Sequence, residues 1–339
     1  MGPLRPASGA WRAQWVVYTE RYQSMVTANP SFSTLTFRHP APDDAARVLE
    51  LLIRRDLVEV GHPDTILEDL QRDWDHMDLE RDAWLAVTPE GGLAGYAAVL
   101  PWKAALRYDV LVDPSWPGDA QELSRDLLAR CQARGAELAR GGACQPIARL
   151  YIAHVNAAER AMAEAAGFRL VRYQFQMRIQ MEAPPPPPEW PAGVKLRTAL
   201  PGQDDRALHA FMQAAFDQPG RTPQPFEAWH EFMIQSPLFR AELWFLAEAG
   251  GELAGACLCF ACPDIGWVQQ LGVVEGQRRR GLGTALLRHA FVEFWKRDMR
   301  LVGLAVQAEN EAAVALYEAA GMKRVQQYDE YQQSILSAM

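Results

Sequence analysis

Several features are scarce in this sequence, and each scarcity excludes a class of protein. Five cysteines in 339 residues are too few for a disulfide framework and favour a reducing compartment. No apolar run approaches the roughly 20 residues that span a bilayer. The N-terminus also lacks the charged region and apolar core of a signal peptide. We therefore expect a cytoplasmic protein with no membrane partner.

Positive charge is scarce as well. The formal net charge of −8 argues against nucleic acid as a partner and slightly favours cationic substrates such as amines. Apolar residues make up 49% of the chain and charged residues 22%, as in a soluble globular protein. The length exceeds that of one ordinary core, which predicts two domains.

The segment from Trp267 to Thr284 combines features of a phosphate cradle. A strand-like run ending at Val274 is followed by three arginines and then by Gly281-Leu282-Gly283. The apolar spacing beyond them predicts a helix. Glycines let backbone N–H groups approach a ligand, and a helix start attracts anions. The segment therefore predicts a pyrophosphate site, with a solvated turn as the alternative.

The order of predicted elements occurs twice. Leu93-Ala94-Gly95 recurs as Leu253-Ala254-Gly255 in matching hairpins. Asn156 to Gly167 and Asn310 to Gly321 have the same length, and both end in Glu-Ala-Ala-Gly. Internal duplication is the best account of the length.

A run of five prolines, Pro184 to Pro188, separates the two halves. It must form polyproline II and would act as a spacer of roughly 15 Å. A docking site for a proline-binding module is the alternative. Trp11 to Met25 is compatible with an accessory helix. The predicted organisation is an N-terminal extension (1–34), a first domain (35–182), a Pro-rich linker (183–193) and a second domain (194–339).

These motifs resemble those of the GNAT superfamily of acyl-CoA-dependent N-acetyltransferases. The superfamily signature stands here as Arg278 to Gly283, after the strand residues Leu271-Gly272-Val273. Asn310 and Tyr317 match the family's Asn-x-x-Ala-x-x-x-Tyr-x-x-x-Gly pattern. The tandem arrangement is most similar to double-GNAT proteins of the mycothiol synthase group.

The resemblance implies an α/β (α+β) fold of two tandem GNAT domains. Each would be a mixed, largely antiparallel twisted sheet flanked by helices. It also implies acetyl-CoA as cosubstrate. No metal is expected, because Cys257, Cys259 and Cys262 lack the spacing of a metal site. The implied cofactor-binding residues are Leu271, Gly272, Val273, Arg278, Arg279, Arg280, Gly281, Leu282, Gly283, Thr284, Asn310 and Ala313.

In the family context, Tyr317 is the candidate catalytic residue. Asn310 is expected to be the N-cap of a helix that begins at Glu311. Tyr317 lies seven positions after Asn310 and so on the same side of that helix. Its phenol would protonate the departing CoA thiolate. Reference pKa values of ~10 and ~8.5 make that transfer uphill by roughly 2 kcal/mol. Core packing is the alternative role.

The strand before the glycine turn supplies no general base, because Gln269 and Gln270 cannot accept a proton at neutral pH. Glu309 and Asp264 are the nearest carboxylates in the sequence. An α-amine of pKa near 8 costs only about 1.4 kcal/mol to deprotonate at pH 7, against about 4.6 for a lysine. The lack of an obvious general base therefore slightly favours an acceptor amine of low pKa. Candidate substrate contacts are Arg221, Trp229 and Gln269, with core packing as the alternative for the aromatic ring.

The first half lacks the glycine signature. Its strand is followed by Asp113 to Asp119, where Pro117 removes a backbone donor and Asp119 would repel a pyrophosphate. The position that matches Tyr317 is Ala163. We expect a degenerate first domain and a catalytic second one that acetylates a primary amine of a small molecule or peptide. A CoA-binding sensor without activity is the alternative, and the sequence leaves the oligomeric state open.

Overall fold

The structure, a computed structural model, describes residues 35–63, 65–102, 105–141, 146–217 and 223–335. The predicted helix at Trp11 to Met25 and the candidate Arg221 lie outside these residues. The chain forms two compact units. Unit 1 contains the described residues up to Leu100 and Tyr108–Arg134, and unit 2 contains the described residues among 101–107 and from Gly135 onward. The domain boundaries predicted at residues 183–193 stay a prediction, because these units follow three-dimensional contacts and not the sequence repeat.

Unit 1 is a small sheet with helices, in the order β1-β2-β3-β4. Its apolar core is formed mainly by α2, α3 and the strands β2 and β3. Arg134 donates to buried Asp82 at 2.7 Å, so this core also contains a satisfied ion pair. The elements that lie wholly or mostly in unit 1 are β1 (Thr36–Arg38), the 3-10 turn η1 (Pro42–Asp44), α2 (Ala45–Glu59), α3 (Leu67–Asp75), α4 (Leu79–Asp82), β2 (Ala83–Val87), β3 (Leu93–Trp102), β4 (Ala105–Val112) and α5 (Ala120–Arg140).

Unit 2 contains a longer sheet in the order β5-β12-β6-β11-β10-β9-β8-β7. Its elements are β5 (Ile147–Ala153), α6 (Ala157–Ala165), β6 (Arg169–Gln180), β7 (Val194–Thr198), α7 (Asp205–Ala215), α8 (Phe226–Met233), β8 (Phe239–Ala249), β9 (Glu252–Ala261), β10 (Gly266–Val273), η2 (Glu275–Gln277), α9 (Leu282–Lys296), β11 (Leu301–Gln307), α10 (Glu311–Ala319) and β12 (Lys323–Ser334). The pairing is antiparallel except between β10 and β11 and between residues 106–107 and 148–149. The mixed, largely antiparallel sheets with flanking helices confirm the predicted fold class.

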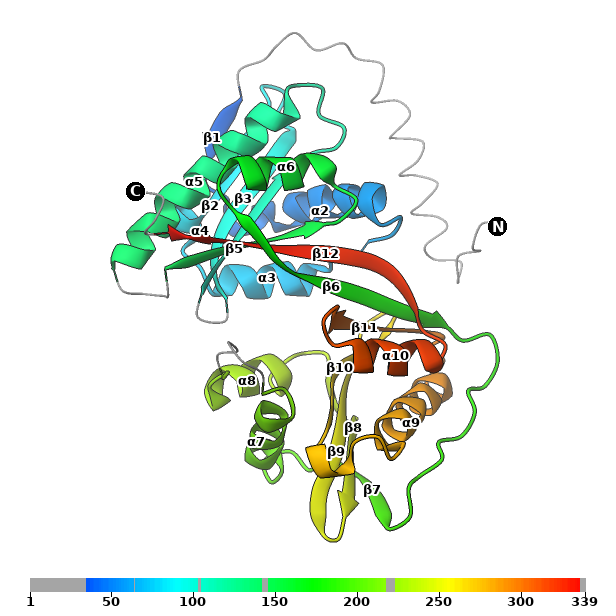
Figure 1. Ribbon diagram of the computed structural model, residues 1–339. Coiled ribbons are helices and arrows are strands. Elements are labelled where there is room, and N and C mark those ends of the chain that lie inside the picture. The colour runs from blue at the N-terminus through cyan, green and yellow to red at the C-terminus, as the bar shows by residue number, and fades with distance from the viewer. Residues whose placement is uncertain (1–34, 64, 103–104, 142–145, 218–222, 336–339) are drawn as a thin grey trace. The chain divides into compact units, whose positions relative to one another are not determined.

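The internal repeat is visible in the element bounds. β5, α6 and β6 begin and end 154 positions before β11, α10 and β12, as in 301 − 147 and 334 − 180. The halves have nevertheless exchanged their last strands. β6 lies between β11 and β12, and β12 lies between β5 and β6 (Figure 1). Each half therefore builds its sheet with a strand from the other.

The two faces of the unit 2 sheet differ in character. One face carries the main apolar core, in which α9 and α10 pack on residues such as Met177 and Leu304. On the other face, α7 and α8 pack on β8, β9 and the start of β10. Paired residues of neighbouring strands share a face. The register therefore places a row of polar side chains beside the α7 and α8 cluster: Gln307, Gln174, Gln176, Gln326, Tyr328 and Glu330. We call this the polar face.

The segment after the prolines is packed against the second half. The ring of Trp190 lies 5.8 Å from that of His289 on α9, and it contacts the main core. Glu189 also lies 4.0 Å from Arg288 on α9, so the chain between β6 and β7 is anchored to this helix at residues 189–190. Within the part of the chain that the structure describes, every helix is too short or too polar to cross a lipid bilayer.

Candidate functional site

The predicted cradle begins where two parallel strands separate. β10 pairs with β11 only at Gly266–Val302 and Trp267–Gly303, whereas it pairs with β9 along its whole length. An irregularity between Val268 and Gln270 bends β10 just beyond the last parallel pair. The backbone of Leu271 to Val273 therefore leads away from β11, which leaves room for an extended ligand to pair beside it.

Two glycines make the close packing around this opening possible. A Cβ on Gly303 would lie 2.8 Å from the ring of Trp267, so that ring covers the strand at this point. A Cβ on Gly272 would lie 3.0 Å from Ala215 on α7. Both distances are shorter than ordinary contacts, and larger residues would push these elements apart.

The glycine turn leaves the start of α9 uncapped. Gly281 is the N-cap residue with φ of 84°, a left-handed conformation that glycine adopts without strain, and no side chain caps the helix. The first N–H groups of α9 therefore have no side-chain acceptor. Gly283 lets α10 come close, since a Cβ there would lie 3.0 Å from Leu316. This geometry fits a pyrophosphate at the helix start.

The three arginines of the turn have different surroundings, although all three are exposed. The Arg278 guanidinium donates to the carbonyls of Val273, at 3.0 Å, and Ala215, at 3.3 Å. It thereby links the end of β10 to the end of α7. Arg280 donates to Gln277 at 2.7 Å, and Arg279 has a φ of 59°. The expectation that all three pair with phosphates stays a prediction, and Arg278 has a structural role in addition.

The second predicted motif lies at the start of α10. The side-chain oxygen of Asn310 accepts a hydrogen bond of 3.2 Å from the Ala313 amide, so Asn310 is the helix cap that the sequence predicted. This bond occupies the N–H group of Ala313, which is itself one of the implied cofactor-binding residues. Thr284 and Leu282 lie in the first turn of α9, and Leu282 is buried in the core.

Tyr317 is buried, with 8% of its surface exposed, among the core residues between α10 and β9. Burial raises the pKa of its phenol well above the ordinary value, and the nearby Cys257 thiol adds to the shift. The phenol is therefore protonated at physiological pH and is able to donate. The structure therefore shows a buried phenol packed in the core, and its role as the general acid stays a prediction.

The α7 and α8 side of the site is lined by tryptophans that hold the two glutamines. The Trp267 indole donates to Gln269 at 2.8 Å, and the Trp229 indole donates to Gln270 at 3.3 Å. Trp229 is fully buried and lies 5.9 Å from Trp244, ring to ring. The ring of Trp229 therefore packs in the core and positions Gln270. Glu309 and Asp264 are both exposed.

Comparison with known proteins agrees with this geometry. A sequence profile described as the Acetyltransferase (GNAT) family matches residues 207–322. A mycothiol acetyltransferase of Cellulomonas flavigena is 30% identical over 260 residues, which are 71% of this chain and 72% of that protein. The one from Streptomyces coelicolor is 32% identical over 249 residues, 70% of this chain and 75% of its own length. The chain belongs to the GNAT family of acetyltransferases. It is therefore an acyltransferase, as the resemblance implied.

Other relatives extend the comparison. The mycothiol acetyltransferase of Thermobispora bispora is 37% identical over 170 residues, but the match spans only 57% of its length and 47% of this chain. A GCN5-related N-acetyltransferase from Sphaerobacter thermophilus has a TM-score of 0.78 and 33% identity, over 89% of this chain and 96% of its own. A tandem GNAT protein from the clavulanic acid biosynthesis pathway has a TM-score of 0.67 at 18% identity, over 89% and 99% of the two chains, which shows the shared fold.

In the first half of this GNAT protein, the equivalent turn lies at residues 113–119, before α5. Side chains of the turn itself occupy the space and the first N–H groups of this helix. The Asp119 carboxylate accepts hydrogen bonds from the amides of Gln121 and Glu122 at 3.0 and 2.9 Å, so it caps α5. Trp116 lies so close to Gly118 that a Cβ there would be 2.3 Å from its ring. Two of the first N–H groups of α5 are therefore already occupied by the Asp119 carboxylate.

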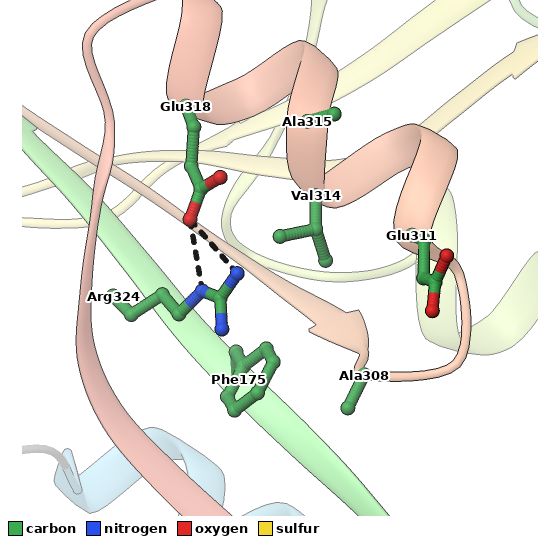
Figure 2. Close-up of a pocket in the computed structure, with 7 residues that line it drawn as sticks. All are labelled: Phe175, Ala308, Glu311, Val314, Ala315, Glu318 and Arg324. Atoms are coloured by element: carbon green, nitrogen blue, oxygen red, sulfur yellow. Dashed lines mark hydrogen bonds and ion pairs between the residues drawn. The ribbon is translucent and has the colours of Figure 1, made fainter.

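A second feature of the GNAT half is a pocket of ≈ 330 Å³ beside α10 (Figure 2). Arg324 donates to Glu318 at 2.9 Å, and its guanidinium lies 4.5 Å from the centre of the Phe175 ring. The other lining residues are Ala308, Glu311, Val314 and Ala315. None of the predicted site residues lines this pocket, so it is separate from the site described above.

The repeat gives this pocket a counterpart in the first half with different chemistry. The residues 154 positions away from Ala308, Val314 and Phe175 are His154, Arg160 and Asp329. Asp329 is 1% exposed and bonds to His154 Nδ1 at 2.8 Å, with Arg160 at 3.9 Å. A hydrogen bond from His154 and an ion pair with Arg160, both to Asp329, therefore fill the place that the second half leaves as a pocket.

Sequence reasoning missed several residues of the site. The link from Arg278 to Ala215 joins positions 63 apart in the sequence, and the indole bonds to Gln269 and Gln270 depend on the bend in β10. The alternation along β6 and β12 was the available signal for the polar face, but only the exchanged strand order brings these residues together.

Proposed function

We propose that this GNAT protein transfers the acetyl group of acetyl-CoA to a primary amine, using the second half alone. The observation that carries the proposal is the difference between the two helix starts. Gly281 leaves the N–H groups of α9 without a side-chain cap, whereas Asp119 caps α5. A pyrophosphate needs such unoccupied donors.

In the proposed reaction, the amine nitrogen attacks the thioester carbonyl carbon and the C–S bond breaks. The departing sulfur takes a proton from Tyr317, the ammonium formed in the attack loses its proton to water, and the Tyr317 phenolate then regains a proton from solvent. The backbone near Val273 would polarise the carbonyl. Because Tyr317 has a raised pKa, its proton moves as the C–S bond breaks and not before.

The residues in the attacking amine's region favour an acceptor that is neutral near physiological pH. Gln269 and Gln270 are held by indole donors and offer amide groups, which do not take a proton. Deprotonating an amine of pKa near 8 costs about 1.4 kcal/mol at pH 7, which water can accept. We therefore infer an acceptor amine whose pKa lies below that of a lysine side chain.

Thiol release from acetyl-CoA with a panel of primary amines tests the proposal. The panel would contain an α-amino peptide, an amino sugar, a lysine side chain and the deacetylated form of mycothiol, because relatives are named for mycothiol. Release above the hydrolysis background with at least one amine is expected. If acetyl-CoA binds tightly while every amine is left unacetylated, the protein is a CoA-binding sensor instead.

A further inference from the structure

The polar face carries a charged cluster at the end far from the glycine turn. Arg149 pairs in register with Gln332, and Tyr151 pairs with Glu330. On the other side of β12, Glu330 pairs with Arg172. Paired residues point to the same face, so these side chains from β5, β12 and β6 gather around Glu330. All of them belong to unit 2.

The ion pairs of this cluster are long. Arg149 Nε lies 3.5 Å from one oxygen of Glu330, and Arg172 Nε lies 3.5 Å from the other. Strong charge-assisted bonds are about 2.7–2.9 Å, and arginine usually binds a carboxylate with two parallel bonds. Arg149 Nε is buried and has no hydrogen-bond partner among the described residues. Arg149 also forms a side-chain hydrogen bond with Tyr151. Each guanidinium has five N–H donors, so both arginines still keep donors for another acceptor.

Burial and charge point to the same conclusion. The side chain of Glu330 is only 7% exposed, whereas that of Arg172 is 41% exposed. Two positive charges surround one carboxylate in a chain of net charge −8. Gln332 donates to Glu330 at 2.9 Å and helps to fix it. The Glu330 carboxylate thus holds the two arginines together, while Arg172, the more exposed of the two, remains accessible to an anion from solvent.

The cluster lies on the same face as the opening between β10 and β11. Ala305 pairs with Gln176, and Arg172 is four residues away from Gln176 on β6. Four residues of strand span about 13 Å, so the backbones of Arg172 and Gln176 are about that far apart. The Arg172 side chain covers part of this distance. Gln174 and Tyr328, which pair with each other, lie between. Both amide atoms of Gln326 on this face are buried without a hydrogen-bond partner among the described residues.

We propose that Arg149 and Arg172, held by Glu330, bind an anionic group of the acceptor, about 10 Å from its amine. This rests on the proposed acetyl transfer. The group is a carboxylate or a phosphate, since both present two or more oxygens to guanidinium donors. The acceptor is thus an extended molecule with an amine at one end and an acid at the other.

Binding of inorganic phosphate, measured by titration calorimetry at constant ionic strength, tests the site without turnover. Saturating CoA would occupy the glycine turn, so that phosphate cannot bind there. Arg172→Gln should weaken phosphate binding about tenfold, as expected for a bond to a charged group. Arg324→Gln, which removes an exposed arginine that is also paired with a glutamate, is the matched control. Equal binding to the wild type and Arg172→Gln, or no binding to either, would overturn the proposal.

Acetylation of three matched peptides tests the site during turnover. The probes are Ala-Ala-Ala amide, Ala-Ala-Ala with a free carboxylate, and Ala-Ala-phosphoserine amide, since three extended residues span about 10 Å. We expect kcat/KM to favour an acidic probe about tenfold, through KM. The more active acid distinguishes carboxylate from phosphate. Arg172→Gln should bring the ratio of acid to amide near one, and Arg172→Lys should restore part of it.

The outcomes separate this inference from the proposed function. Turnover of all three peptides with no preference for acid contradicts the anion site and leaves the acetyltransferase reading intact. If no amine of any kind is acetylated, the proposed function fails. The calorimetric comparison of wild type with Arg172→Gln then still decides whether the anion site exists.

Discussion

In each half of the chain a strand leads into a long helix: β4 precedes α5, and β10 precedes α9. The two helices differ in whether a side chain caps their first N–H groups. α5 is capped by the Asp119 carboxylate, while α9 begins at Gly281 without any side-chain cap. One arrangement stabilises its own helix, and the other leaves its donors for a ligand. The comparison shows how a duplicated element can serve structure in one copy and binding in the other.

The sheet shows the same contrast. The residues 154 positions before Gly303 and Ala305 are Arg149 and Tyr151. Small residues stand at the opening of the second half, whereas large charged and aromatic ones fill the equivalent position in the first. Burial and Glu330 raise the pKa of Tyr151, which fits a filled site. The first half therefore places Arg149 and Tyr151, two of the side chains around Glu330, where the second half has small residues.

The largest expected effect concerns the tyrosine that only the second half has. Tyr317→Phe should lower kcat by about 10²–10⁴, the usual contribution of a general acid, with little change in the melting temperature. Thiol release under saturating acetyl-CoA measures it. Tyr331→Phe removes a buried phenol that donates to Glu164 and should leave kcat unchanged. An unchanged kcat for Tyr317→Phe would show that Tyr317 is a core residue only.

The next effect comes from giving the second half the acidic cap of the first. Gly281→Asp should weaken CoA binding by at least about tenfold relative to Gly281→Asn, as a carboxylate at the helix start competes with the pyrophosphate. Both variants share the strain of a side chain at a φ of 84°. The dissociation constant of CoA from calorimetry gives the comparison. Equal constants for the two variants would argue against a pyrophosphate at this turn.

A smaller effect is expected from the link between β10 and α7. Arg278→Gln removes hydrogen bonds to Val273 and Ala215, so KM for acetyl-CoA should rise by a factor of about 3–10. Steady-state kinetics measures this rise. Arg240→Gln is the control, because Arg240 also donates to two backbone carbonyls but on β8. A rise of equal size in both variants would mean that general destabilisation is the cause.

The first-half cap should affect stability alone. Asp119→Ala should lower the free energy of unfolding by about 1 kcal/mol, whereas Asp119→Asn keeps the cap and should cost only a few tenths. Urea denaturation measures both values. The kcat/KM for acetyl-CoA should stay the same in both variants. A lower kcat/KM in Asp119→Ala would reveal that the first half takes part in cofactor binding.

The smallest expected effect concerns the pH dependence of kcat, in which Tyr317 should not titrate over the physiological range. The pKa of Tyr317 is raised, so its phenol stays protonated in the folded protein and kcat should show no decline assigned to it below about pH 10. The unfolded chain has the lower pKa. The stabilising contribution is thus complete below about pH 10 and is lost as the pH rises above it. A pH profile of wild type beside Tyr317→Phe would expose an earlier titration, which contradicts this assignment.

The sequence predicted the fold, and the uncapped glycine turn at the start of α9, because their signals are local. Gly281, Asn310 and the hairpin repeats act within a few residues of themselves, and the caps and turns formed where they were expected. The exchange of β6 and β12 had no local signal, since strand partners depend on the whole chain. Trp229 shows the same limit. Its aromatic character fitted both substrate contact and core packing, and only its complete burial shows where the ring lies.

The exchange of strands also has a consequence for synthesis of the chain. Residues of β5 pair with residues of β12 that follow 175 to 187 positions later, from Ala153 with Tyr328 to Ile147 with Ser334. While the ribosome is still making the second half, the first half has an unpaired strand edge, which is prone to aggregation. We expect nascent chains stopped after β6 to need a chaperone, and the two halves to acquire their native sheets together, once β12 has emerged.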